Sequence, residues 1–198
     1  MRWANFGRGC LAGPVVAAAV ILPDDFFHEK LNDSKKMSAK NRDLVYDYII
    51  EHAIAYGIAQ VSVEEIEKRN ILNASMMAMH KAIELMGVQP DFILADGNQF
   101  HAYCPAVNQK MFPGIPAIPN IPHECIIKGD GKYASIAAAS VLAKVSRDRL
   151  MKKLAEKHPG YGWETNAGYG TKAHIDAIKE TGVTEWHRMS FLTGIIKD

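Results

Sequence analysis

The sequence from residue 128 to residue 151 reads Lys-Gly-Asp-Gly-Lys-Tyr-Ala-Ser-Ile-Ala-Ala-Ala-Ser-Val-Leu-Ala-Lys-Val-Ser-Arg-Asp-Arg-Leu-Met, and this stretch decides the fold. The apolar run Cys125–Ile127 before it reads as a strand that ends near one carboxylate, Asp130. A long helix of very small residues is predicted to follow, from about Tyr133 to Lys157. Small side chains let a bulky ligand approach a helix backbone, and an acid at a strand end can hold a metal. The stretch therefore favours metal-assisted chemistry on a large, phosphate-bearing substrate.

Outward from this stretch, strand and helix patterns alternate, which predicts an α/β fold with one mixed sheet. Runs typical of strands cover Leu11–Leu22, Tyr56–Val63, Phe92–Ala95 and His123–Ile127. Patterns typical of helices cover 39–52 after the N-cap Ser38, a short acidic stretch from Ser62 or Val63, 73–86, 133–157, and 172–181 between Thr171 and Gly182. No repeat or linker interrupts the pattern, so the 198 residues are expected to form one domain.

Two further stretches are assigned structural roles. The proline-rich segment Pro105–Pro122 is expected to be a long irregular connection. The helix predicted over 73–86 carries an apolar stripe, which we interpret as core rather than as a metal or cofactor site. The stripe consists of Met76, Met79, Ile83 and Met86.

Composition excludes several classes of protein. Hydrophobic residues make up 48% and charged residues 23%, which excludes a largely disordered chain. The longest apolar run, Pro14–Pro23, is too short to cross a bilayer and no signal peptide is evident, so no membrane partner is expected. The three cysteines form no CxxC pair, which indicates free thiols in a reducing cytoplasm.

Charge is distributed unevenly although the net charge is only +1. Residues 128–157 carry eight Lys/Arg against three Asp/Glu, whereas residues 38–67 carry two against six. A basic segment set against an acidic one is typical of a protein that binds a polyanion. An ordinary solvated helix face has the same appearance.

Asp96 and Asp130 are the first candidates for chemistry, because each lies just beyond a predicted strand. Ligands of open α/β sheets bind beyond the carboxyl ends of strands, so two such acids can meet there. Carboxylates, water and substrate phosphates are what Mg²⁺ prefers. The alternative is a pair of ordinary turns, because Asp-Gly is a common turn dipeptide.

Two glycine-flanked side chains are candidates for substrate contacts. Gly7-Arg8-Gly9 offers exposed backbone N–H groups and a guanidinium that can bind phosphate or sugar oxygens. Gly168-Tyr169-Gly170 presents an aromatic ring that can stack on a sugar or base. Ordinary turns are the alternative for both.

Other motifs are weaker. Residues 129–132 invite a P-loop interpretation, but Ile126 stands where that motif needs its first glycine. The loop residues 34–36 offer a hydroxyl and two cations, which is equally typical of a plain surface loop. His174 and His187 are candidate proton carriers, or else ordinary histidines. A nucleotide-binding domain is disfavoured, because no GxGxxG motif is present either.

The order of the motifs carries more information than any one of them. They are Gly7-Arg-Gly-Cys-Leu-Ala-Gly-Pro-Val-Val, Asn32-Asp-Ser-Lys-Lys, Asn70-Ile-Leu-Asn-Ala-Ser-Met, Asp96-Gly-Asn, Lys128-Gly-Asp, Ser135-Ile-Ala-Ala-Ala-Ser-Val-Leu-Ala-Lys-Val-Ser-Arg-Asp, Gly168-Tyr-Gly-Thr and His187-Arg-Met-Ser-Phe. In this order, over residues 7–191, they resemble bacterial type 2 ribonuclease H (ribonuclease HII). The resemblance implies a ribonuclease-H-like mixed sheet flanked by helices, with a helical C-terminal part over about 158–198.

The resemblance also implies an activity. Enzymes of this family hydrolyse the RNA strand of RNA–DNA hybrids and nick duplex DNA on the 5′ side of an embedded ribonucleotide, with Mg²⁺ or Mn²⁺. This implies a cytoplasmic monomer that acts in replication and ribonucleotide excision repair.

The family's site residues transfer onto matching positions of this chain. Asp96 and Asp130 match metal ligands, and Gly7, Arg8 and Gly9 match the loop that senses the 2′-hydroxyl at an RNA–DNA junction. Tyr169 matches a tyrosine that packs on the deoxyribose beyond that junction. Lys128, with lysines and serines of the small-residue helix, is expected to hold phosphates.

One departure from the family is serious. Its first motif is Asp-Glu-x-Gly-Arg-Gly, whereas this chain has Ala4 and Asn5 in place of the two acids. Those acids are two of the four carboxylates that hold the metals, so we expect weakened metal binding and severely reduced or absent cleavage. The mismatch is confined to residues 1–6, and we expect the preceding part of the first strand to be missing too. We hypothesise that residues 1–6 are foreign, through an altered reading frame, a misplaced start or a cloning remnant; a natural inactive relative and a deliberate knockout are the alternatives.

Overall fold

The centre of the molecule is a mixed β-sheet with strand order β3-β2-β1-β4-β5. The computed structural model describes residues 2–100 and 121–196, with the backbone alone for 2–6. The strands are β1 (Arg2–Phe6), β2 (Val15–Ile21), β3 (Ala55–Val61), β4 (Ile93–Asp96) and β5 (His123–Ile126). β1 pairs antiparallel with β2 and β2 with β3, whereas β4 runs parallel to both β1 and β5. The predicted mixed α/β sheet is confirmed.

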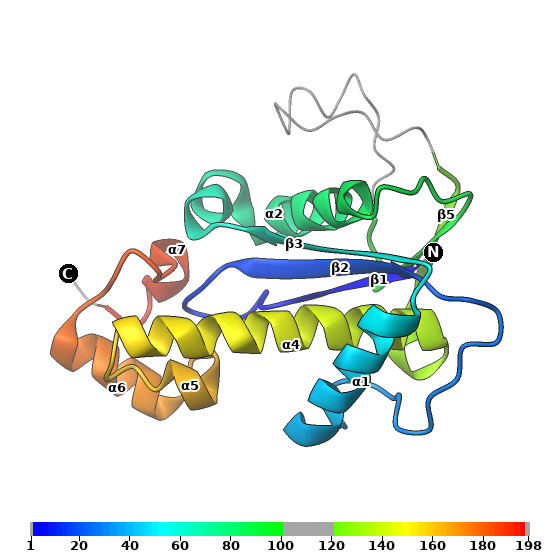
Figure 1. The fold of residues 1–198 in the computed structure, drawn as a ribbon. Helices are drawn as coiled ribbons and strands as arrows, with labels where there is room; N and C mark the ends of the chain where they lie inside the picture. Colours follow the sequence, from blue (N-terminus) through cyan, green and yellow to red (C-terminus); the bar gives the residue numbers. More distant parts are fainter. Residues whose placement is uncertain (1, 101–120, 197–198) are drawn as a thin grey trace.

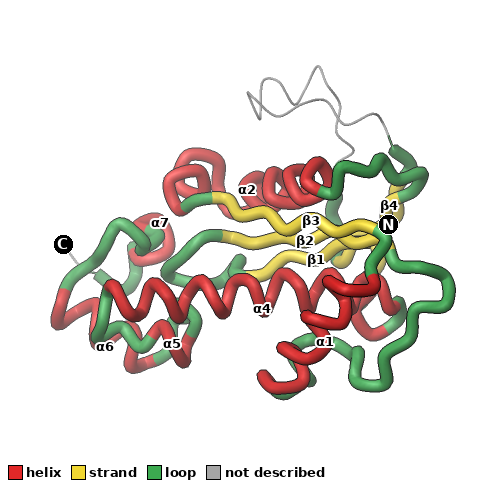
Figure 2. The backbone as a smooth tube through the Cα atoms, in the orientation of Figure 1, coloured by secondary structure: helices red, strands yellow, loops and turns green. Residues whose placement is uncertain are grey.

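Helices cover both faces of this sheet (Figure 1). The helix α2 (Val63–Leu85) lies on one face, and α4 (Ala134–Lys157) lies on the other with α1 (Ala39–His52) packed beside it. The short helices α5 (Trp163–Asn166), α6 (Lys172–Thr181) and α7 (Met189–Leu192) gather beyond one end of the sheet (Figure 2). No helix in the described ranges is long and apolar enough to span a membrane.

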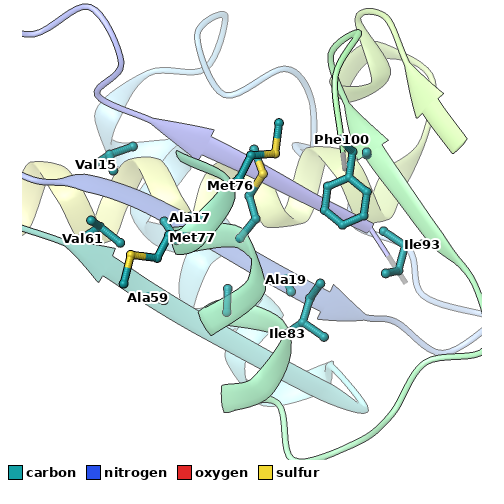
Figure 3. Packing of buried hydrophobic residues seen from close by; sticks show 14 of the residues in the cluster. Val15, Ala17, Ala19, Ala59, Val61, Met76, Met77, Ile83, Ile93 and Phe100 are labelled. Atoms are coloured by element: carbon teal, nitrogen blue, oxygen red, sulfur yellow. The ribbon is translucent and has the colours of Figure 1, made fainter. Parts of the chain in front are cut away.

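The core between α2 and the sheet contains the predicted methionine stripe. Met76, Met79, Ile83 and Met86 are all buried in it, and Figure 3 shows Met76 and Ile83 facing the strands. Flexible methionines fill the irregular space against the small side chains of β2. Gly57 of β3 allows close contact, because a Cβ there would lie 2.0 Å from the carbonyl oxygen of Ala82. The interpretation of the stripe as core is confirmed.

The small residues of α4 have a different role from the expected one. Ala138, Ala139 and Ala143 are fully buried in the core that α4 forms with β2 and α1. Small side chains here bring the helix close to the sheet. The expectation that the small residues receive the substrate is therefore wrong for these three buried alanines, whereas Ala134 at the start of α4 is exposed.

Cap residues fixed the ends of two helices correctly. The Ser38 hydroxyl accepts the Asn41 N–H at the start of α1, and the Thr171 hydroxyl accepts the His174 N–H at the start of α6. Each cap satisfies a backbone donor that has no partner within the helix. Gly182, with φ of 90°, ends α6.

One expected strand is shorter than predicted. The strand expected over Leu11–Leu22 begins only at Val15, because Cys10 and Ala12 form isolated bridges to Tyr169 and His187. The two helices expected between residues 62 and 86 are present as the two parts of α2, which are separated by a kink at Asn70 with the non-helical φ of 67° and ψ of 162°. Residues Arg2–Phe6, for which no strand was predicted, form β1 between β2 and β4. The connection expected over Pro105–Pro122 lies almost entirely outside the described residues.

Candidate metal and nucleic-acid site

Asp96 and Asp130 come together as the sequence predicted. Asp96 is the last residue of β4, and Asp130 lies in the single turn η1 (Gly129–Gly131) after β5. Strands β4 and β5 are parallel neighbours, so their carboxyl ends share one edge of the sheet. The Gly129 N–H donates to Oδ1 of Asp96 at 3.0 Å. This bond ties Asp96 to the residue before Asp130, and the charge of Asp130 acts on Asp96.

The electrostatics of this pair suit a cation. Burial raises the pKa of Asp96; the Gly129 N–H opposes this rise, and the negative charge of Asp130 adds to it. Two carboxylates that repel each other gain from a divalent ion between them, and water and substrate phosphates can complete its coordination. Within residues 2–100 and 121–196, no three His, Cys, Asp or Glu side chains form a group able to hold a metal. The described donors therefore fit one hard cation, and fall short of a site for two.

The strand register places the first of the two missing acids next to Asp96. Trp3 pairs with Ala95 in the parallel ladder between β1 and β4, so the next position along each strand is Ala4 beside Asp96. Ala4 pairs on its other side with Ala18 of β2. A carboxylate at position 4 would therefore start from the backbone next to Asp96.

The loop of residues 32–37 approaches the same edge. The charge of Lys35 lowers the pKa of Asp96 and that of Asp33 raises it, so both act on the site. The loop is anchored by a buried pair of hydroxyls, Ser34 Oγ and Ser140 Oγ, which are 2.8 Å apart. Sequence reasoning noticed residues 34–36 but could not place them near Asp96. Ser140 is a buried anchor, so the expectation that serines of α4 hold phosphates is wrong for it.

The Gly7–Gly9 turn and Tyr169 form one unit. Leu11 N–H donates to the Gly168 carbonyl at 2.8 Å, and Cys10 forms a β-bridge with Tyr169. Gly7 has φ of 92°, a conformation that favours glycine, while Arg8 and Gly9 are exposed. The Tyr169 side chain is 39% exposed beside this turn.

The unit formed by Gly7–Gly9 and Tyr169 lies at the same edge of the sheet as the acid pair. Gly7 is three residues after Ala4 and directly follows the end of β1, so the turn begins about 10 Å beyond the level of Asp96. Lys128 lies two residues before Asp130, exposed, with a left-handed φ of 56°. The predicted residues thus fall along one edge, from Lys128 and the acids to the turn and Tyr169.

His174 and His187 belong to a buried cluster and not to an exposed proton relay. Trp163 Nε1 can only donate, and it lies 3.0 Å from Nε2 of His174, so the His174 proton is on Nδ1, 2.9 Å from the Tyr169 carbonyl. The Thr184 N–H donates to Nδ1 of His187. Both rings are neutral, because burial lowers the pKa of each, to about 4 for His187. Their role is to hold the backbone at Tyr169.

Several basic side chains of α4 form ion pairs or hydrogen bonds within the protein. Arg149 pairs with Asp43 of α1 at 3.0 Å, and Lys144 pairs with Asp148 at 2.7 Å. Arg147 is fully buried, with three hydrogen bonds to backbone carbonyls. Pairing of this helix with acidic α1 therefore explains part of the uneven charge, and Arg147 is not a surface cation.

The mixed sheet in the order β3-β2-β1-β4-β5, covered by helices on both faces, is of the ribonuclease-H-like class. Solved structures share this fold: ribonuclease H2 from Pyrococcus horikoshii has a TM-score of 0.76 at 21% identity, covering 98% of this chain and 94% of its own. Ribonuclease HII from Archaeoglobus fulgidus, solved as a complex with PCNA, has a TM-score of 0.75 at 23% identity, covering 100% and 98%.

The chain belongs to the ribonuclease HII family, whose model matches residues 5–194. Ribonuclease HII of Christiangramia forsetii is 54% identical over 185 residues, which are 93% of this chain and 86% of that protein. The corresponding protein of Ruegeria pomeroyi is 52% identical over 188 residues, 94% of this chain and 73% of that protein. The family consists of divalent-metal-dependent endoribonucleases that act on RNA–DNA hybrids.

Proposed function

We propose that this chain binds RNA–DNA hybrids and DNA duplexes with embedded ribonucleotides, and hydrolyses the phosphodiester on the 5′ side of the ribonucleotide. The observation that carries the proposal is the approach of Asp130 to Asp96, at the edge of the sheet that also holds the Gly7–Gly9 turn. A metal site and a ribose-reading loop on one edge can act on the same strand.

Each residue of this edge has a distinct task in the proposal. Asp96 and Asp130 would hold Mg²⁺ or Mn²⁺, and such an ion would supply activation of a water molecule and charge stabilisation at the leaving oxygen. Arg8 and the flanking glycine N–H groups bind the 2′-hydroxyl, the group that distinguishes RNA from DNA. Tyr169 packs on the deoxyribose beyond the junction, and Lys128 binds a phosphate, which orients the duplex without reading its sequence.

We further propose that cleavage is strongly reduced in this chain. Two carboxylates cannot offset the repulsion between two divalent ions as four can, and Ala4 and Asn5 add no charge beside Asp96. Arg8 and Tyr169, the residues proposed to contact the two sugars, are both present in the sequence. This combination favours a second candidate function, that of a binder of the same duplexes without turnover.

The C-terminal helices belong to the same domain in this proposal. Residues of α5, α6 and α7, including Trp163, Ile178 and Leu192, share a buried core with Leu154 of α4. A core shared with the long central helix supports one domain with a helical C-terminal part from about residue 158.

A nicking assay tests the proposal. The substrate is a DNA duplex with one embedded ribonucleotide, incubated with Mn²⁺ or Mg²⁺, beside the same duplex without the ribonucleotide. Slow nicking on the 5′ side that Asp96→Asn abolishes supports a residual enzyme. Selective binding of the ribonucleotide duplex without nicking supports the binder. Equal binding of both duplexes without nicking would refute the proposal.

A further inference from the structure

Two arginine side chains are buried behind the Gly7–Gly9 turn. Arg147 of α4 is 1% exposed, and Arg188, just before α7, is 0% exposed. Burying a guanidinium is costly unless it is hydrogen-bonded, and here each of the six guanidinium nitrogens donates one hydrogen bond. Each of these six bonds ends at a backbone carbonyl.

The carbonyls that these arginines bind come from two segments. Arg188 donates from Nη1 to the Arg8 carbonyl at 3.1 Å, and from Nε and Nη2 to the Gly13 carbonyl at 2.9 and 2.7 Å. Arg147 donates to the Ala12 and Pro14 carbonyls at 2.9 and 3.1 Å, and to the Ala167 carbonyl at 2.6 Å. Arg188 thus holds the turn that carries Arg8, and Arg147 ties the same segment to the one that leads to Tyr169.

The backbone packs tightly around these contacts. A Cβ at Gly7 would lie 2.2 Å from Nε of Arg147. A Cβ at Gly168 would lie 2.5 Å from the Ala12 carbonyl oxygen. The two glycine-rich segments therefore lie directly on the guanidinium groups and on each other, so a shift of either arginine moves the backbone of Arg8 or Tyr169.

A role in stability alone explains this arrangement poorly. Well-packed apolar side chains of similar volume are often at least as stabilising as buried charges. A guanidinium differs from them in presenting rigid, planar donors that fix the carbonyls around it. Fixed geometry matters where two contacts must meet adjacent sugars of one strand.

We propose that Arg147 and Arg188 are positioning residues that set the separation of Arg8 from Tyr169, and through it the selectivity for a ribose–deoxyribose junction. This inference rests on the proposed function, because it assigns Arg8 and Tyr169 to the two sugars. Neither arginine touches the substrate; both act through backbone carbonyls.

The test is a binding ratio and not an activity. Fluorescence anisotropy with EDTA present measures the dissociation constants of a labelled DNA duplex with one ribonucleotide and of the same duplex without it, at one salt concentration. The variants are Arg147→Lys, Arg188→Lys and Arg188→Gln. Each is included if its circular dichroism spectrum matches that of the unmodified chain, the parent. Ile49→Val is the control. Ile49 of α1 is buried in the core that α1 shares with α4, so its truncation lowers stability without affecting the Gly7–Gly9 turn.

The parent chain is expected to prefer the ribonucleotide duplex by about tenfold. The arginine variants should reduce this preference to about twofold or less, as Arg8→Ala should, while Ile49→Val keeps it. A parent without preference would overturn the proposed function itself. A parent with preference whose folded arginine variants all retain it would overturn only the positioning role.

Discussion

Nε2 of His187 lies 3.3 Å from Nε2 of His174 in the cluster that supports the backbone at Tyr169. Only one of these nitrogens can carry a proton, because two facing N–H donors would repel each other. Nδ1 of His187 accepts from the Thr184 N–H, which places the His187 proton on Nε2, facing the acceptor of His174. The cluster is therefore built for two neutral rings.

Acid should destabilise the protein through this cluster. The pKa of His187 is about 4 in the folded chain, below the ordinary value of 6.5, so the unfolded chain binds a proton first as the pH falls. The stabilising contribution is complete above pH 6.5 and is lost between pH 6.5 and 4. We expect the free energy of unfolding to fall by about 2–3 kcal/mol from pH 7 to 4.5. Urea denaturation at both pH values measures this change. His187→Gln should reduce the pH dependence of the free energy of unfolding, whereas His52→Gln, at an exposed position, should leave it unchanged. An unchanged pH dependence in His187→Gln would contradict the assignment.

The hydroxyl pair of Ser34 and Ser140 should behave as a coupled unit. Removing one hydroxyl leaves the other buried without its partner, so Ser140→Ala is expected to cost about 1–3 kcal/mol. The double variant Ser34→Ala/Ser140→Ala should cost less than the sum of the single variants. A double-mutant cycle from urea denaturation checks this, and simple additivity would show that the two hydroxyls are independent.

Gly57→Ala should weaken the packing of α2 on β3. Its Cβ would lie 2.0 Å from the Ala82 carbonyl, and neither backbone can move freely. We expect a loss of about 3 kcal/mol in stability. Gly194→Ala, where nothing lies within 4 Å of the new Cβ, should change stability by less than about 0.5 kcal/mol. Equal thermal midpoints for the two variants would contradict the close approach of α2.

Asp96→Asn should have opposite effects without and with metal. Burial and the charge of Asp130 raise the pKa of Asp96, so at pH 7 its ionised form is unfavourable and the neutral amide should raise the unfolding temperature in EDTA. Mn²⁺ at about 100 times its dissociation constant should stabilise the parent by about 2.7 kcal/mol and Asp96→Asn much less. Differential scanning calorimetry measures both; Asp176→Asn on the exposed side of α6 is the control. A variant that keeps the full Mn²⁺ effect would exclude Asp96 as a ligand.

Local signals in the sequence were sufficient for elements whose ends are set by caps. Ser38, Thr171 and Gly182 fixed two helices within a residue, because each satisfies or ends a helix by itself. The two parts of α2 were predicted as separate helices, and the kink at Asn70 separates them, although its left-handed φ could not be predicted because no residue type except glycine signals it. The strand β1 was missed because residues 2–6 match no family motif, although five residues suffice to pair.

The site could be predicted only in part for a similar reason. Asp96 and Asp130 were found because the end of a strand is a local feature whose place in a parallel sheet is known. Arg147 and Arg188 were not, since an arginine that binds carbonyls far along the chain looks like any surface cation in the sequence. Both arginines lie in motifs that carried the family resemblance, His187-Arg188 and Ser146-Arg147-Asp148. The resemblance alone gave no physical role for them.

Restoring the two acids tests the central claim most directly. The variant Ala4→Asp/Asn5→Glu places carboxylates on β1 beside Asp96, and its initial rate of nicking on a duplex with one ribonucleotide is compared with the parent in Mn²⁺. We predict an increase of at least about 100-fold, which corresponds to about 2.7 kcal/mol of transition-state stabilisation. A folded double variant with the rate of the parent would contradict the account, because the acid pair would then not be half of a metal site.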